Sequence, residues 1–251
     1  MRENNFNKRK SSNTNIIMGL HPVMEAIGVG VVIDKIMIQR GLKGELIEEL
    51  MVLVKEHRFG YSYVPVQKLN RITRKNHQGV IAFISPIDFP SLNNVVMNLF
   101  EQGINPKLLM LDGVSDVRNF GAIARSAECF GFHAIVIPFS GAAQVNEDAV
   151  KTSAGALLKI KVCKANNLPH TIGFLKDSGV HVVGMTEKSE DLVSGVEIDR
   201  PICLVMGAED VGISDEVLKE CDALVKIPMS GSIQSLNVSV SAGIAMYEFC
   251  R

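Results

Sequence analysis

The stretch IPMSGSIQSLNVSVSAGIAMYEF, residues 227–249, joins the end of an apolar strand, a glycine-containing loop and a helix rich in small residues. The strand ends at Pro228, and Ser235 is placed to cap a helix over residues 236–249. Small side chains along that helix allow close packing against another backbone. The polar run through Asn237 is unusual for a core helix, and capping with internal hydrogen bonds explains part of it.

Upstream of this stretch, short apolar runs alternate with segments of helical character. The runs predict strands at LLML (108–111), AIVIP (134–138), HVVGM (181–185), ICLVM (202–206) and ALVKIP (223–228). Apolar strands separated by helices predict a parallel sheet with helices on both faces. Such a sheet binds ligands at the carboxyl ends of its strands, so functional residues are expected in the loops that follow them.

The loop after the fourth of these strands lies within VMGAEDVGISDEVL, residues 205–218. Two glycines, Gly207 and Gly212, bracket Glu209 before a helix that Ser214 would cap. The pattern is neither GxGxxG nor a Walker A loop, so it indicates neither a dinucleotide nor a nucleoside triphosphate. Many strand-to-helix loops look like this one, and the segment alone does not define a function.

A third segment, LDGVSDVRNFGAIARSAECFGFHAIVIP, leads from the first of these strands into a helix. Asn119 is predicted as its N-cap. Arg125 is then expected about a turn and a half into the helix, near the end where the helix dipole disfavours a cation. Two interpretations of Arg125 carry equal weight: it binds an anion such as a phosphate, or it pairs structurally with Asp112 or Asp116.

The N-terminal third of the chain follows a separate pattern of short strands and helices. The pattern predicts helices at 21–27 and 45–57 and strands at 34–39, 61–66 and 80–84. Prolines in SPIDFPSLNN (85–94) predict a linker, which a helix around 92–102 follows. The expected organisation is a disordered tail (1–15), an N-terminal α/β domain (16–85), a linker with a helix (86–106) and a C-terminal α/β domain (107–251).

Charge is distributed unevenly along the chain. Residues 1–85 contain 13 Lys and Arg against 7 Asp and Glu, whereas the remainder contains 13 against 20. The asymmetry predicts a polyanion as partner of the N-terminal part, although a basic solvated surface explains it equally well. His77 lies close in sequence to Arg71, Arg74 and Lys75, so it either contacts that polyanion or stabilises a turn.

Several classes of protein are disfavoured by the sequence. No run approaches ~18 apolar residues, and the N-terminus lacks the apolar segment of a secretory signal, so a cytoplasmic protein without a membrane span is expected. The five cysteines form no CxxC pair and show no metal-ligand spacing, so most are expected to be small buried apolar residues. There is neither an HExxH nor a GxSxG motif.

Taken together, the three segments resemble the motifs of the SpoU (TrmH-like) family in the SPOUT superfamily of RNA methyltransferases. Asn119, Gly121 and Arg125 match N-x-G-x-x-x-R, Gly207, Glu209 and Gly212 match G-x-E-x-x-G, and residues 227–240 match I-P-M-x-G-x-x-x-S-L-N-V-S-V. Three motifs in this order are specific, although the first two are weak alone. Val117 stands where many members have proline, a departure that affects loop stiffness more than chemistry.

The resemblance extends to the N-terminal domain. Gly19-Leu-His-Pro-Val and Asn76-His-Gln-Gly-Val80 are similar to the two ends of the substrate-binding domain in the branch that methylates a guanosine of large-subunit ribosomal RNA. This implies RNA, and ribosomal RNA in particular, as the partner. The RNA-binding residues would then be Arg71, Arg74, Lys75, His77 and Arg125.

The resemblance also implies features that the pattern of residues does not predict. The C-terminal domain would be an α/β-knot, a deep trefoil knot formed by the second and third motif segments, and the protein would be a homodimer with its active site near the subunit interface. The cofactor would be S-adenosylmethionine, without a metal. It would lie against Thr186, Gly207, Ile227, Met229 and Leu236, and the catalytic residues would be Asn119, Arg125, Glu209, Ser235 and Asn237.

The implied reaction is in-line attack of a ribose 2′-oxygen on the sulfonium methyl group, which requires above all alignment of the reactants. Because the pKa of arginine lies above ~12, Arg125 is expected to bind the neighbouring phosphate and stabilise the developing alkoxide rather than act as a base. Asn119 would orient Arg125 or the ribose, and Glu209 would position Asn119 or Arg125. Ser235 and Asn237 would brace the third motif against the first.

Four other functions compete with this one. The same chemistry could act on transfer RNA, or as a resistance-type methylation of ribosomal RNA. A non-catalytic RNA-binding protein is a second class, which the intact set of five catalytic motif residues disfavours. A small-molecule methyltransferase is less favoured, since it would not need the N-terminal domain.

Overall fold

The computed structural model describes residues 16–196, 199–232 and 235–251. The predicted disordered tail, residues 1–15, lies outside the described residues. The chain divides into two compact units, with the division between Ile84 and Ser85. In the described segments, no helix is long and apolar enough to cross a lipid bilayer.

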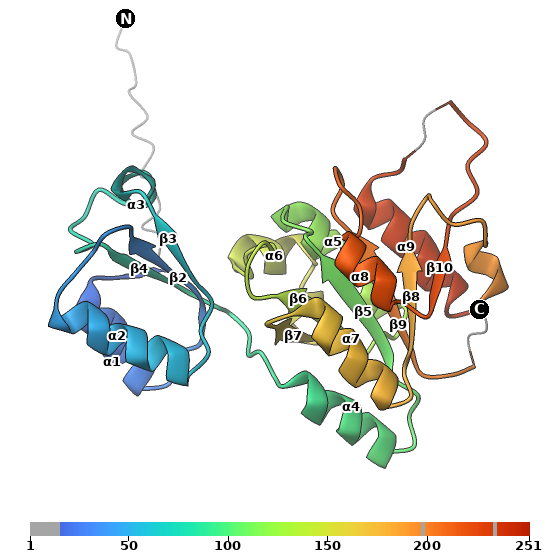
Figure 1. The fold of residues 1–251 in the computed structure, drawn as a ribbon, viewed down its shortest axis with the longest axis horizontal. Helices are drawn as coiled ribbons and strands as arrows, with labels where there is room; N and C mark the ends of the chain where they lie inside the picture. The colour runs from blue at the N-terminus through green and yellow to red at the C-terminus, as the bar shows by residue number, and fades with distance from the viewer. Residues whose placement is uncertain (1–15, 197–198, 233–234) are drawn as a thin grey trace, which may run out of the picture. The chain divides into compact units, whose positions relative to one another are not determined.

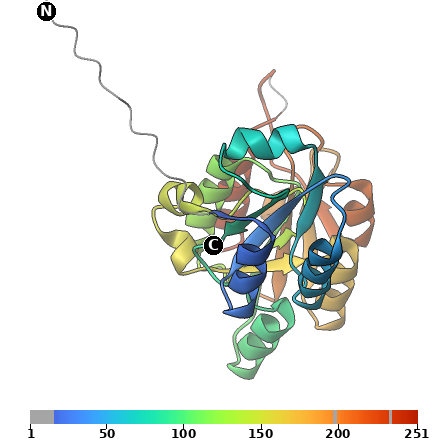
Figure 2. The ribbon, with the colours of Figure 1, turned by 90° about the vertical axis from the view of Figure 1, so that its left-hand side faces the viewer.

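The N-terminal unit is a four-stranded sheet in the order β1-β4-β2-β3. Its elements are β1 (Ile16–Met18), α1 (Leu20–Gly28), β2 (Ile33–Gln39), α2 (Glu45–Glu56), β3 (Tyr61–Val64), α3 (Val66–Ile72) and β4 (Val80–Ile84). Helices α1 and α2 pack side by side (Figures 1 and 2) over Ile36 and Ile38 of β2. Met37, between those two residues, packs with Leu69 of α3 on the opposite face, as alternation along a strand requires.

The second unit is a six-stranded sheet in the order β10-β8-β9-β5-β6-β7, and all its neighbouring strands are parallel. The strands are β5 (Lys107–Asp112), β6 (Ala134–Pro138), β7 (Lys161–Ala165), β8 (His181–Met185), β9 (Ile202–Gly207) and β10 (Ala223–Val225). The helices are α4 (Leu92–Glu101), α5 (Val117–Cys129), α6 (Glu147–Thr152), α7 (Leu168–Asp177), α8 (Asp215–Glu220) and α9 (Val238–Glu248). The predicted parallel α/β class is confirmed.

Both faces of this sheet are buried (Figure 1). On one face, Leu109 and Leu111 of β5 pack with residues of α5, α6 and α9. On the other, Leu108 and Met110 pack with residues of α4, α7 and α8. This double burial explains why the strands appear as continuous apolar runs in the sequence.

The segment that the sequence assigns to a linker and a helix, residues 86–106, belongs to the second unit in the structure. Four apolar residues of α4 lie in the core with Leu108 and Met110 of β5, namely Leu92, Val95, Val96 and Leu99. Helix α4 is therefore part of the C-terminal unit's helical layer, and the boundary between the units falls at the first residues of SPIDFPSLNN.

The cysteine prediction holds for only part of the set. Cys163 and Cys203 are buried, and burial raises the pKa of both thiols, to about 12 for Cys163. Cys221 is half-buried, whereas Cys129 and Cys250 are exposed. Because only two of the five cysteines are buried, the expectation that most are buried is wrong. Cys129 and Cys250 lie at or just beyond the C-terminal ends of α5 and α9.

Candidate active site

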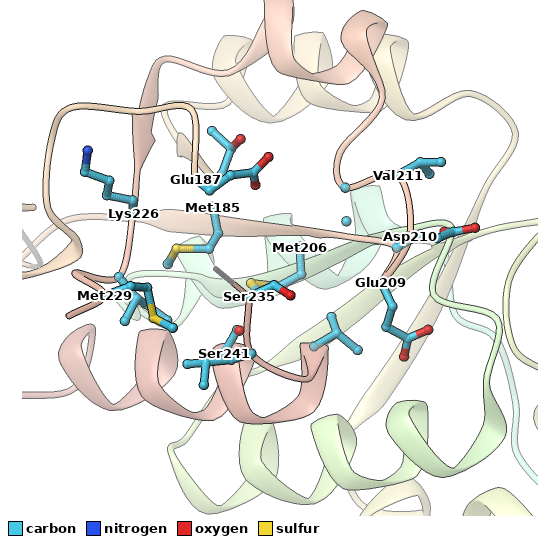
Figure 3. Close-up of a pocket in the computed structure, with 17 residues that line it drawn as sticks. Met185, Glu187, Met206, Glu209, Asp210, Val211, Lys226, Met229, Ser235 and Ser241 are labelled. Carbon is cyan, nitrogen blue, oxygen red and sulfur yellow. The ribbon is translucent and has the colours of Figure 1, made fainter. Parts of the chain in front are cut away.

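A cavity of ≈ 410 Å³ opens at the carboxyl ends of β8 and β9, bounded by α9 (Figure 3). This is the edge where a parallel sheet binds ligands. The sequence predicts five cofactor-binding positions, and all five line this cavity: Thr186, Gly207, Ile227, Met229 and Leu236. They come from three separate stretches of chain that the fold brings together around one hollow.

Gly207 ends β9 and lies against the loop that follows it. A Cβ atom at this position would be 2.0 Å from the carbonyl carbon of Gly212 and 2.1 Å from the backbone nitrogen of Ile213. The loop is held in this position by two backbone hydrogen bonds between Ala208 and Gly212, of 2.9 and 3.0 Å. Gly212 has a φ of 71°, a left-handed conformation that favours glycine. Both glycines of the second motif are thus required by the shape of the loop.

The same loop is tied to the end of β5. The backbone N–H of Ser214 donates to Oδ2 of Asp112 at 2.8 Å. Ser214 occupies the predicted N-cap position of α8, but its side chain makes no capping hydrogen bond there. Asp112 therefore has a structural role in joining the carboxyl ends of β5 and β9.

One chain of hydrogen bonds connects the three motifs. The side-chain amide of Asn119, in the first turn of α5, donates to Oε1 of Glu209. The side-chain amide of Asn237 donates to Oδ1 of Asn119 at 3.2 Å. Glu209 and Asn237 are 90 and 118 positions from Asn119 in sequence. The two contacts therefore fix the second and third motifs against the first.

The capping predictions need correction. Asp116, not Asn119, caps α5, with Oδ1 accepting from the backbone N–H groups of Arg118 and Asn119 at 2.8 and 3.0 Å. Asn237, not Ser235, caps α9, with Oδ1 accepting from the backbone N–H of Ser239 at 2.9 Å. Because Asp116 performs the capping, the side chain of Asn119 is free to reach Glu209.

Ser235 and Glu209 both line the cavity, so two of the five predicted catalytic residues lie at the pocket itself (Figure 3). Asn119 and Asn237 reach it through Glu209 and the hydrogen-bond chain. The predicted bracing by Asn237 is present as a hydrogen bond. Ser239 completes this cluster, since its hydroxyl donates to Oδ1 of Asn237 at 2.6 Å.

Arg125 is the ninth of the 13 residues of α5, so it lies beyond the middle of that helix. The argument that it sits near the positive end of the helix is therefore wrong, because the helix starts two residues before Asn119. Among the described residues, the exposed Arg125 side chain forms no ion pair. The alternative, a structural ion pair of Arg125 with Asp112 or Asp116, also lacks support. Both carboxylates accept hydrogen bonds from backbone N–H groups elsewhere.

The cavity carries an excess of acidic groups. Glu187, Glu209 and Asp210 are among its lining residues, against a single lysine, Lys226 (Figure 3). Lys226 is in turn 3.4 Å from a carboxylate oxygen of Glu190. The remainder of the lining is largely apolar and includes Met185, Met206, Met229, Ile227, Leu236 and Val238. The site thus suits a ligand that has an apolar part and a positive charge.

Sequence reasoning missed Glu187 and Asp210, the other two carboxylates of the lining. Both could have been found from the rule that ligands bind beyond the carboxyl ends of parallel strands. Glu187 comes two residues after β8 ends, and Asp210 three residues after β9 ends. In the described parts of the chain, no group of three or more His, Cys, Asp or Glu is arranged to hold a metal ion.

Four of the five predicted RNA-binding residues lie at the end of α3 and in the turn before β4, and the fifth, Arg125, lies on α5 of the second unit. Arg71, Arg74 and Lys75 are exposed. His77 is buried: its Nε2 is 2.9 Å from Oδ1 of Asn70, and its Nδ1 accepts from the N–H of Gly79 at 3.0 Å. Both ring nitrogens are used within the unit, which favours the turn-stabilising interpretation of His77.

The two N-terminal segments singled out in the sequence meet in space. The N–H of Gly19 donates to the carbonyl of Val80 at 3.1 Å, and the N–H of Leu20 donates to Oε1 of Gln78 at 3.3 Å. Gly19 has a φ of 94°, and a Cβ there would lie 2.9 Å from Oε1 of Gln78. The contacts of Gly19 and Gln78 therefore join the two segments at one end of the N-terminal sheet.

Two family models match the chain, one for each of its two compact units. The model of the SpoU rRNA methylase family matches residues 106–247, and a model for RNA 2′-O ribose methyltransferase substrate binding matches residues 16–90. The chain belongs to the SpoU family of RNA methyltransferases.

Individual relatives span almost its whole length. The chain is 35% identical, over 94% of its length and 95% of the relative, to a Staphylococcus aureus protein assigned to the TrmH family of tRNA/rRNA methyltransferases. The fold is similar to the SpoU methyltransferase AviRb from Streptomyces viridochromogenes, with a TM-score of 0.59, 21% identity and coverage of 94% and 88% of the two chains. An rRNA methyltransferase from Sinorhizobium meliloti gives a TM-score of 0.58, 24% identity and coverage of 94% and 86%. Both of these structures contain AdoMet.

Proposed function

We propose that the protein transfers the methyl group of S-adenosylmethionine to a ribose 2′-hydroxyl of RNA, at a guanosine of large-subunit ribosomal RNA. The observation that carries this proposal is the hydrogen-bond chain from Asn237 through Asn119 to Glu209, at the edge of a cavity of suitable size and charge. We place the reaction in the cytoplasm, where such RNA is found.

The residues of the cavity fit S-adenosylmethionine. Its ≈ 410 Å³ lies within the range of small-molecule sites, roughly 300–1,000 Å³. Met185, Ile227 and Leu236 offer apolar surface to the adenine ring, while Glu187 and Asp210 offer negative charge to a ligand that carries a net positive charge. When bound, this donor supplies a methyl group on a positively charged sulfonium, so the reaction needs no further activation of the methyl carbon. The charge of the lining favours the donor, which has a net positive charge, over its product, a zwitterion without net charge.

The protein's own residues would align and activate the acceptor. Arg125 would bind the phosphate next to the target ribose and stabilise the negative charge that develops on the 2′-oxygen as its proton passes to solvent water. Asn119, held by Glu209 and Asn237, would orient the ribose or Arg125. Ser235 lies in the cavity lining and would brace the third-motif loop against the donor.

Asn237 holds Asn119 and also caps α9, and two substitutions separate these roles. Asn237→Ala removes both the cap of α9 and the donor to Asn119, so we expect a loss of about 1 kcal/mol of stability, a Tm lower by about 2–4 °C, and kcat lower by about 10- to 100-fold. Asn237→Asp keeps the acceptor for the N–H of Ser239 but has no donor for Asn119. We expect it to restore Tm without restoring kcat. Recovery of both quantities in the aspartate variant would show that only the cap matters.

A homodimer is supported by an exposed apolar stripe on α9. Val240, Ile244 and Tyr247 are 49%, 36% and 54% exposed, and their spacing of three and four residues puts them on one face. That stripe would be covered by a second copy, with the active site near the interface. The trefoil knot is proposed from family membership, with its loops formed by residues of the second and third motifs.

The dimer is tested by light scattering on the full chain. Val240→Asp is expected to shift the molar mass from that of a dimer to that of a monomer, because it places a charge in the buried contact. Val52→Asp is the matched control, since Val52 is also exposed, at 63%, but lies on α2 of the other unit. A wild-type protein with the mass of one chain would contradict the dimer.

The site of methylation is tested by alkaline hydrolysis of RNA labelled from radioactive S-adenosylmethionine. A methyl group on the 2′-oxygen prevents that oxygen from attacking the adjacent phosphate, so the label is expected in dinucleotides that resist alkali. Label in ordinary mononucleotides would assign the methyl group to a base instead. Sequencing of the resistant fragments identifies the nucleotide, with a transfer-RNA site as the outcome that would contradict the ribosomal target.

A further inference from the structure

Two tyrosines on β3 form an exposed aromatic pair. Tyr61 and Tyr63 are 39% and 49% exposed, and their ring centroids are 5.8 Å apart with the ring planes at 86°. The hydroxyl of Tyr63 lies 3.9 Å from Sδ of Met51 on α2, which fixes that ring against the neighbouring helix. Both residues point to the same face of the sheet because they are two positions apart in a strand.

The position of β3 explains why these rings remain uncovered. In the parallel pairing of β3 with β2, Tyr61 is opposite Ile36 and Tyr63 is opposite Ile38. Both isoleucines are fully buried under α1 and α2, but β3 is the edge strand, and the tyrosines beside them stay exposed. Three of the four residues of β3 are exposed. The helical layer therefore leaves two aromatic rings in contact with solvent at one edge of the unit.

The segment of sequence that contains these rings is positively charged. Residues 57–84 contain five Lys and Arg and no Asp or Glu, namely Arg58, Lys68, Arg71, Arg74 and Lys75. Helix α3, which follows β3 after a single proline, carries two of these cations and packs on the face of the sheet opposite the rings. A single strand would therefore reach both by passing around the edge formed by β3. A basic segment with exposed aromatic side chains is suited to unpaired nucleic acid, because cations bind its phosphates while rings stack on its bases.

We propose that Tyr61 and Tyr63 form a stacking surface for unpaired bases of the RNA substrate, and that the basic α3 segment binds the phosphates of the same strand. This inference rests on the proposed function in taking RNA as the substrate. It adds that the RNA presents a single-stranded loop to the N-terminal unit rather than a continuous duplex, whose stacked bases would not be accessible to the rings.

Tyrosine fluorescence reports on this contact directly. The chain has no tryptophan and three tyrosines, so with excitation at a wavelength that phenylalanine does not absorb, Tyr247→Phe leaves Tyr61 and Tyr63 as the only emitting side chains. In this variant, titration with a single-stranded oligouridylate is expected to quench most of the emission, because stacking on a base quenches a tyrosine. A blunt RNA duplex of the same length is expected to bind through its phosphates with little quenching. Equal quenching by duplex and single strand would overturn the proposal.

Affinity for the same oligonucleotide, labelled and followed by anisotropy, provides a second measurement. Tyr61→Leu and Tyr63→Leu are each expected to weaken binding roughly tenfold, whereas Tyr61→Phe and Tyr63→Phe keep a ring and wild-type affinity. Phe100→Leu, which alters an exposed ring on α4 of the other unit, is the control and is expected to have no effect. Thermal melting confirms that each leucine variant is folded.

Methyl transfer to RNA by the same preparations distinguishes this inference from the proposed function. If the wild type methylates RNA while the folded leucine variants bind as tightly as the wild type, stacking is wrong and the methyltransferase assignment stands. If the wild type methylates no RNA but its tyrosines are quenched and the leucine variants bind weakly, stacking stands and the methyltransferase assignment is wrong.

Discussion

Replacement of Arg125 by alanine is expected to lower kcat for RNA methylation by about 10³-fold while leaving the Kd for S-adenosylmethionine unchanged. Removal of one preorganised group that stabilises developing negative charge costs a factor of this size. Arg125 is absent from the residues that line the cavity, so donor binding is not expected to depend on it. Single-turnover methyl transfer and calorimetric titration of the donor measure the two quantities independently.

Two variants serve as controls for Arg125. Arg125→Lys keeps the charge but loses the planar fork of donors, so it is expected to recover only part of the lost rate. Arg118→Ala removes the same charge from the first turn of the same helix and is expected to keep kcat within a few-fold of the wild type. Normal turnover by Arg125→Ala, or a loss of donor affinity in that variant, would contradict the role given to this residue.

Substitution of Gly207 by alanine is the second change with a large expected effect. The added methyl group would occupy the space of the Gly212–Ile213 peptide, at distances of 2.0 and 2.1 Å, where only backbone can yield. Displacement of the loop would move Ala208 through Gly212, all of which line the cavity. We expect affinity for S-adenosylmethionine to fall by at least about 100-fold, together with a lower Tm.

Gly173→Ala is the matched control for this substitution. Gly173 lies in α7, and a Cβ there meets no atom within 4 Å. Alanine in a helix is favoured over glycine by about 1 kcal/mol, so this variant is expected to keep donor affinity and to melt at the same or a higher temperature. Wild-type donor affinity in Gly207→Ala would mean that the cavity is not the donor site.

The central strands of the second unit could be predicted because they are buried on both faces. Strands β5, β6, β8 and β9 appear in the sequence as apolar runs for this reason. Strand β7, with the sequence KVCKA, was missed. It pairs only with β6 at the edge of the sheet, and charged residues at an edge interrupt the apolar run. The short β1 was missed because three residues carry too little pattern.

The sequence predicted which residues belong to the candidate site better than it predicted their hydrogen bonds and the starts of the helices that carry them. The five cofactor positions line one cavity, and Asn119, Glu209 and Asn237 form one hydrogen-bond chain, although the first two motifs are weak signals when taken alone. The starts of α5 and α9 were misplaced by three and two residues, because SDVRN contains three residues that can cap a helix and SLN contains two. Tertiary hydrogen bonds decide between such neighbours, and a single sequence does not contain them.

The measurement that tests the central claim most directly is transfer of labelled methyl groups from S-adenosylmethionine to separate pools of large-subunit ribosomal RNA, small-subunit ribosomal RNA and transfer RNA. The pools are taken from cells that lack this protein, and wild type and Arg125→Ala are assayed side by side. We predict label in large-subunit RNA alone, at the ribose 2′-oxygen of a guanosine, with the wild type only. Absence of label from every RNA pool would contradict a methyltransferase function and favour a non-catalytic RNA-binding protein.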